Sequence, residues 1–254
     1  MQDGLDFQTA LGLRLVTLGQ ITAGHPINVD GHNVKTYARK AMKHSFITQE
    51  DRDGKAIRTF STQDQTSKKP LIALAAYSGA TVSQVTRRLA SLTRTILGQD
   101  LLMVADKAWY CGQRIQELHT QYGVAVLTPI KSSPKRLREF DAVPLEKYDQ
   151  TVLGNVATVY TTMTDCDGPL RMLLKKRRDG KYFALITPAC DMTAATAMPT
   201  YTKRWRIENF FAENTFLGVN HLPSLNLNAI QTMLALRLLA FHVVDNFRHD
   251  LGPA

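Results

Sequence analysis

The chain has 254 residues, of which 44% are hydrophobic, so it is long enough for one large domain or two small ones with a substantial core. It carries 31 Lys and Arg against 22 Asp and Glu, a formal net charge of +9 that favours a polyanionic partner over a merely solvated basic surface. The three cysteines are isolated and no CxxC pair occurs, which argues against a disulfide framework and a zinc site.

The termini give no sign of a targeting or membrane segment. The N-terminus lacks a basic region followed by an apolar core, so we expect no signal peptide. The most apolar run, residues 229–244, is interrupted by Gln231, Arg237 and His242 and is shorter than a membrane span requires. We therefore expect a buried helix there and no membrane partner.

The first half of the chain has the pattern of a mixed α/β sheet. Apolar residues at helical spacing predict a helix over residues 7–20, and a charged, irregular stretch over 36–55 is predicted to end in a turn at "DRDGK". The remaining elements predicted in this half are strands at 27–30, 56–62, 70–79, 101–105 and 124–130, and helices at 81–97 and 111–122. This order favours a mixed sheet with helices on its faces.

The pattern of apolar and polar residues changes after Pro134. Apolar and polar residues alternate around two turns, which predicts an antiparallel β segment at about 134–190, inserted before the final helices. The turn at Asp165 and Asp167 resembles part of a calcium loop but lacks its further ligands, so we interpret it as a turn. The second turn, "LLKKRRDGK", fits either a solvated hairpin or a DNA contact. Helix is expected again from about 199, with a long apolar helix at about 227–247.

Three carboxylates stand in positions suited to a shared site. Asp30 and Asp106 each follow a short apolar strand, where side chains project into the crevice in which open α/β sheets place ligands. Glu208 lies in a predicted helix. Three converging carboxylates require a compensating cation, and Mg²⁺ or Mn²⁺ takes oxygen ligands. Each residue also has a structural interpretation: a helix N-cap for Asp106, a turn for Asp30, and a surface pair with Arg204 for Glu208.

Together the segments "NVDGH", "MVADKAWY" and "YTKRWRIENFF", in this order, resemble DDE transposases of the insertion-sequence-four type. The family signature near its last acid is Tyr, Arg, Glu and Lys, and Tyr201, Arg204 and Glu208 keep its spacing. Thr215 stands at the position expected for the signature Lys. The resemblance covers about residues 27–247.

The resemblance implies an RNase H-like catalytic domain over 27–254, carrying the β insertion, after a short helical segment over 1–26. It implies that Asp30, Asp106 and Glu208 are catalytic and hold Mg²⁺ or Mn²⁺, in two ions, while Tyr201 and Arg204 contact the DNA backbone. The implied partner is double-stranded DNA, both transposon ends and target, with the enzyme working as a homodimer in the bacterial cytoplasm, at the nucleoid when bound to DNA.

Two departures leave alternatives open. Thr215 removes one charge from the signature, and relatives usually carry an all-helical domain before the catalytic core, whereas only about 26 residues precede the first strand here. A catalytically dead DNA-binding remnant and an RNase H-fold nuclease that cuts without joining ends are therefore the rivals of an active transposase. The aromatic side chains around Glu208, among them Trp205, are expected mainly in the core, with base stacking by Trp205 as the alternative.

Overall fold

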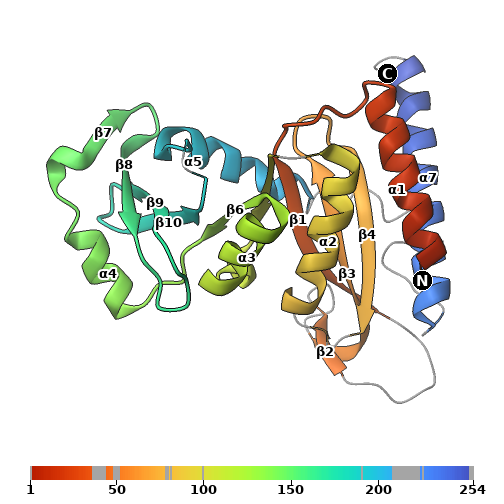
Figure 1. The fold of residues 1–254 in the computed structure, drawn as a ribbon, viewed down its shortest axis with the longest axis horizontal. Helices are drawn as coiled ribbons and strands as arrows, with labels where there is room; N and C mark the ends of the chain where they lie inside the picture. Colours follow the sequence, from red (N-terminus) through yellow and green to blue (C-terminus); the bar gives the residue numbers. More distant parts are fainter. Residues whose placement is uncertain are drawn as a thin grey trace. The chain divides into compact units, whose positions relative to one another are not determined.

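The computed structural model describes residues 2–35, 44–47, 52–77, 80, 82–98, 100–189, 191–207, 224 and 226–251. The chain divides into two compact units. The first unit comprises Met1–Gly98 and Trp205–Ala254, and the second comprises Gln99–Arg204. Figure 1 shows that both combine strands with helices, which confirms the predicted mixed α/β class.

The strands of the first unit pair around one long central strand. This strand, β3 (Arg52–Asp64), forms antiparallel pairs with β1 (Ile27–Lys35), β2 (His44–Ile47) and β4 (Pro70–Tyr77). The antiparallel register explains why β3 extends well past its predicted bounds: its first residues pair with β2 and the rest with β1 and β4. The prediction of a turn at "DRDGK" is therefore wrong, because its described residues, 52–55, lie in β3.

Among its described residues, the first unit has three helices: α1 (Gln2–Thr17), α2 (Val82–Leu97) and α7 (Leu227–Leu251). Figure 1 shows α1 and α7 side by side next to β4, and α1 also contacts α2. Side chains from α7, β1, β3 and β4 form a common core whose buried members are Val34, Ile57, Ala73, Ala75, Ile230, Leu234 and Leu238.

Close helix packing in this unit depends on two glycines of α1. A Cβ at Gly4 would lie 3.0 Å from the backbone of Gln231 in α7, and one at Gly12 would lie 2.6 Å from the Ile96 side chain of α2. The absence of a side chain at these positions therefore lets α1 lie against both helices.

Within the described part of the chain, α7 alone is long and apolar enough for a membrane span by length and composition. The same criteria are met by core helices of soluble proteins. Here α7 packs on α1 and β4, with Ile230, Leu234 and Leu238 buried in the core.

The second unit begins with a parallel pair of strands. β5 (Leu101–Ala105) pairs with β6 (Val124–Pro129), and helix α3 (Gly112–Tyr122) connects them, as predicted. Gly123 ends α3 with φ of 62°, a left-handed conformation that glycine adopts without steric cost. The carboxyl ends of β5 and β6 consequently lie at the same edge of the sheet.

The inserted segment extends this sheet in the order β5-β6-β10-β9-β8-β7. Its strands are antiparallel, as predicted. They are β7 (Tyr148–Thr151), β8 (Gly154–Thr161), β9 (Leu170–Lys176) and β10 (Tyr182–Thr187). The insertion also contains a helix that the sequence pattern did not predict, α4 (Pro134–Asp141), which begins at Ser133 as N-cap.

The helical segment after β10 begins earlier than expected. α5 (Ala194–Thr202) starts at a capping box formed by Thr193 and Thr196, and a 3₁₀ turn (Lys203–Trp205) follows it. α5 contacts β6, β8 and β9, and its residues complete a core cluster made of Val104, Leu127, Val156, Leu173, Leu185, Ala194, Ala197 and Met198. Tyr201 packs against this cluster from the last turn of α5.

Candidate active site

Asp106 follows β5 directly and is held in a defined orientation. Its Oδ1 accepts a hydrogen bond from the Ala108 N–H at 3.0 Å, which makes Asp106 the N-cap of a 3₁₀ turn (Lys107–Trp109). Its backbone carbonyl accepts a hydrogen bond of 2.7 Å from the Thr128 hydroxyl on neighbouring β6. The buried Trp109 anchors the turn. The N-cap interpretation and a role as ligand are thus compatible, because the cap occupies Oδ1 alone.

Asp30 lies inside a strand. β1 continues five residues past it, so the expectation that the strand ends at Asp30 is wrong. Asp30 is opposite Ser61 of β3, and its Oδ1 accepts a hydrogen bond from the Gly31 N–H at 2.9 Å. Packing also favours glycine at position 31, because a Cβ there would lie 3.0 Å from the Phe60 ring.

The structure describes two of the three predicted carboxylates and assigns them to different units. Asp30 belongs to the first unit and Asp106 to the second, while Glu208 and Thr215 lie outside the described residues. Among the residues that the structure describes, no group of three His, Cys, Asp or Glu side chains is placed to hold a metal ion. The shared site of Asp30, Asp106 and Glu208 therefore remains a prediction.

Asp64, the other acid near β1, serves a structural purpose. It is fully buried at the end of β3, opposite Ile27, and its Oδ2 accepts a hydrogen bond of 2.6 Å from the Ser67 N–H in the following turn. Its Oδ1 lies 3.5 Å from Nδ1 of His25. These contacts stabilise the turn between β3 and β4, which makes Asp30 the better candidate ligand on this sheet.

Tyr201 and Arg204 meet as the sequence spacing suggests, but by a different geometry. Tyr201 lies in the last turn of α5 and Arg204 in the 3₁₀ turn that follows it, so the two residues lie three apart where the helix tightens. The Arg204 guanidinium carbon lies 5.8 Å from the centre of the Tyr201 ring, and that ring lies 5.6 Å from the ring of Phe183 on β10. Tyr201 is thereby a packed support that holds Arg204. Trp205, in contrast, is 52% exposed, so its assignment to the core is wrong.

The turn that resembles part of a calcium loop caps a helix. Cys111, the N-cap residue of α3, makes no side-chain capping bond. Instead, Oδ2 of Asp165 accepts a hydrogen bond of 2.9 Å from the Gly112 N–H, and Gln116 exchanges two hydrogen bonds of 2.7 Å with the backbone of Asp167. The prediction of a turn is confirmed, and the Asp165 carboxylate caps the start of α3 in place of Cys111.

Sequence reasoning missed one residue that ties the insertion to the segment after Asp106. Arg136, in α4, donates to the hydroxyl of Tyr110 at 3.1 Å and to that of Thr161 in β8 at 3.2 Å. It also pairs with Glu139. These contacts join positions up to 26 residues apart, and no local pattern marks them.

Comparison with known proteins decides the family. The "Transposase DDE domain" family matches residues 26–241 of the chain. The chain belongs to this family. The matched range includes Asp30, Asp106 and Glu208. It confirms the resemblance to DDE transposases. The insertion-sequence-four type is a finer assignment, and the match does not establish it. Curated protein sequences contain no match.

One solved structure similar to this DDE domain is a piggyBac transposase, described as a synaptic complex with hairpin DNA and determined by cryo-EM. The TM-score is 0.55 at 12% sequence identity, and the alignment covers 85% of this chain. At this identity the likeness shows a shared fold alone. The DDE domain spans about half of that transposase, 46% of its length.

Proposed function

We propose that this chain is a DNA transposase of the insertion-sequence-four type that cuts phosphodiester bonds at transposon ends and joins the freed ends to target DNA. The family match over 26–241 carries the proposal. The placement of Asp106 at the carboxyl end of β5, with Oδ1 fixed by a backbone N–H, supports it. The fold shared with a transposase that binds DNA in its own structure agrees with it.

The carboxylates suit a hard divalent cation. Among the described residues, Oδ2 of Asp106 makes no hydrogen bond, and the residue is only partly buried, so this oxygen can face an ion. Asp30, Asp106 and Glu208 would hold Mg²⁺ or Mn²⁺, in two ions, through carboxylate oxygens. When bound, the ions would activate the attacking oxygen and stabilise the leaving oxygen of the scissile phosphate.

Other residues of the chain would bind and orient the DNA. Arg204 presents a planar fork that can bind two phosphate oxygens at once, and its support on Tyr201 reduces the entropy that it loses on binding. The net charge of +9 favours duplex DNA over a neutral partner. We further propose that the enzyme works as a homodimer on DNA, in the cytoplasm and at the nucleoid.

The test is a substitution that removes charge without removing the cap. Asn at position 106 keeps an oxygen that can accept from the Ala108 N–H, but it is a poor ligand for Mg²⁺. Asp106→Asn should abolish Mn²⁺-dependent nicking of a duplex that carries the element's own ends, while DNA binding persists. Asp149→Asn, the same change at an exposed position of β7, is the matched control and should nick like the wild type.

The outcomes separate the proposal from its rivals. Wild-type nicking that Asp106→Asn abolishes supports the transposase, and end joining in the same assay separates it from a nuclease that only cuts. Binding without nicking, with the N-terminal domain of relatives supplied on a second chain, would identify a DNA-binding remnant. Equal nicking by the wild type and Asp106→Asn would refute the assigned site.

A further inference from the structure

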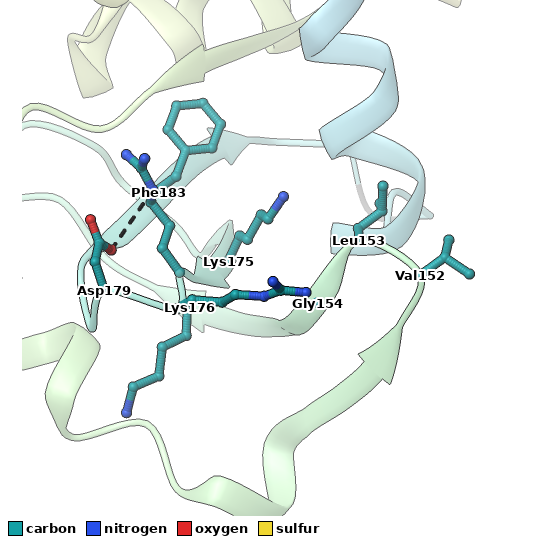
Figure 2. A pocket seen from close by; sticks show the side chains of 9 residues that line it. Val152, Leu153, Gly154, Lys175, Lys176, Asp179 and Phe183 are labelled. Carbon is teal, nitrogen blue, oxygen red and sulfur yellow. Dashed lines mark ion pairs between the residues drawn. The ribbon is translucent and has the colours of Figure 1, made fainter.

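A second candidate site lies entirely within the second unit, at the end of the sheet formed by the insertion. Two turns meet there and enclose a cavity of about 660 Å³, which we call the basic groove. Its lining, drawn in Figure 2, consists of Val152, Leu153, Gly154, Lys175, Lys176, Arg177, Arg178, Asp179 and Phe183.

The antiparallel register explains why residues from two separate turns come together. Asn155, near the start of β8, pairs with Lys176 at the end of β9, and Tyr182 at the start of β10 pairs with Lys176 on the other side. The β7–β8 turn and the β9–β10 turn therefore lie at the same end of the sheet. Lys175 and Lys176 end β9, and Arg177 and Arg178 open the turn that follows, so four consecutive cations are among the residues that line the groove.

Little within the second unit neutralises this charge. Asp179 is the groove's one carboxylate, 3.9 Å from Arg177 and 3.9 Å from the neighbouring Lys181. All three side chains are largely exposed, so these pairs are weak. In the described part of the chain, Lys175, Lys176 and Arg178 have no ion pair, although Lys176 lies 5.7 Å from the centre of the Tyr182 ring. Like charges this close repel one another unless a polyanion binds.

The groove continues towards Tyr201 and Arg204, the residues proposed above to contact DNA. Phe183 lines the groove and pairs in register with Lys175, and its ring lies 5.6 Å from that of Tyr201. Tyr201 in turn supports Arg204. A row of side chains thus runs from the cations of the β9–β10 turn through two aromatic rings to the guanidinium of Arg204.

We propose that the basic groove binds the sugar-phosphate backbone of the DNA on which the transposase acts, at a distance from the reacting phosphate. Lys175, Arg177 and Arg178 supply the charge, while Leu153 and Phe183 offer apolar surface to the sugars. A compact small-molecule site would be lined mainly by apolar and aromatic side chains, whereas four of the nine lining residues here are cations. The inference rests on the proposed function because it takes DNA as the polyanion.

Two substitutions with opposite expected signs test the groove. Arg177→Ala/Arg178→Ala in the full chain should weaken binding to a fluorescent duplex by about tenfold or more at physiological salt, and should reduce the slope of log Kd against log salt by about 2, one per phosphate contact. Asp179→Asn should tighten binding. It removes the groove's negative charge but keeps an oxygen for the hydrogen bond of 3.1 Å that Oδ1 accepts from the Lys181 N–H.

The matched control removes the same charge from the same unit. Lys135 and Arg138 are exposed on α4, and Lys135→Ala/Arg138→Ala should change the salt slope much less than the groove pair does. Equal effects of the two double variants would show that the groove residues act only as general surface charge, and this result would overturn the proposal. So would displacement of the duplex by polyglutamate at equal charge, which would show an acidic peptide site.

The same assay distinguishes failure of the groove from failure of the function. Wild-type binding with groove variants unchanged in affinity and slope overturns the groove alone and leaves the transposase proposal intact. A wild-type chain that binds no duplex at any salt overturns both. Circular dichroism of each variant establishes that a loss of binding does not come from unfolding.

Discussion

The outermost strand of the sheet is buried in the first unit and exposed to water in the second. In the first unit, β4 is apolar and almost entirely buried, and it pairs with β3 on one side. In the second unit, β7 has four residues, is partly exposed and pairs with β8 on one side. An unpaired strand edge presents backbone groups that must find water or another partner, and each unit satisfies this requirement differently.

β4 finds its partners in helix side chains. Gln8 of α1 exchanges two hydrogen bonds with the backbone of Ala73, at 2.7 and 3.2 Å. Gln231 of α7 accepts from the Ala75 N–H at 3.0 Å and donates to the Ala73 carbonyl at 2.6 Å. His242 of α7 lies 3.0 Å from the Pro70 carbonyl. Polar residues in an apolar helix therefore complete the sheet.

β7 needs no such partners because water reaches it. Its turn to β8 leads into the basic groove, where exposed charges and one fully exposed apolar residue, Val152, are available to a ligand. The comparison teaches that a buried strand edge engages polar side chains of the helices packed on it, whereas an exposed edge leaves the polar side chains near it available for binding.

The largest expected effect concerns His242. Burial and the nearby Lys69 charge lower its pKa to about 4, against the opposing influence of the Pro70 carbonyl and Asp245. Because the pKa of the unfolded state is higher, about 6.5, the stabilisation is complete above that pH and is lost as pH falls towards 4. Between pH 7 and 4.5 the free energy of unfolding should fall by about 2 to 3 kcal/mol.

Urea unfolding at several pH values measures this effect. His242→Gln keeps a donor for the Pro70 carbonyl but does not titrate, so its stability should depend less on pH by that amount. Parallel pH profiles for the variant and the wild type would show that His242 is not buried in neutral form at the edge of β4.

Gln231→Leu should have the next largest effect. It leaves the Ala75 N–H buried without its partner, which costs about 1–3 kcal/mol, while the Ala73 carbonyl keeps Gln8. In the double variant with Gln8→Leu that carbonyl loses both donors, so the loss of stability should exceed the sum of the single losses. Thermal unfolding measures all three variants, and additive losses would contradict a shared edge network. Thr232→Val, on the exposed side of α7, is the control.

The smallest expected effect lies in the second unit. Asp165→Ala removes the acceptor from the first turn of α3 and should cost about 1 kcal/mol. Hydrogen exchange at the Gly112 amide should quicken, and Asp165→Asn, which retains an acceptor, should restore much of the protection. If Gly112 exchanges at the wild-type rate in Asp165→Ala, the capping role of this turn is wrong.

Most of the strands and helices could be predicted because their patterns are local. The helices α2 and α3 and the strands β4, β5 and β6 follow from apolar spacing and from a glycine stop. β2 and the first residues of β3 could not be predicted, since β2 has only four residues, the first residues of β3 are polar, and the two segments are paired with each other. α4 was missed because it is short and only Phe140 of its residues is buried.

For the candidate site, the sequence motifs identified residues, whereas the contacts that support them come from the tertiary structure. The resemblance to DDE transposases, which rests on short motifs and their spacing, singled out Asp30, Asp106, Tyr201, Arg204 and Glu208. The support of each side chain comes from distant residues: Thr128 holds the backbone of Asp106, and Phe183 packs against Tyr201. Such contacts leave no periodic signal in the sequence.

The sequence by itself determined the α/β class, the charge, the family and the choice of Asp30, Asp106 and Glu208 as candidate acids, because these depend on residue identity and on spacing along the chain. Tertiary structure decided what Gln8, Gln231, Asp165 and Arg136 do. Each satisfies hydrogen-bonding groups that belong to another element, and which groups lack a partner is settled only when the strands and helices have packed. The same packing gathered the cations of one turn beside the apolar residues of another to form the basic groove.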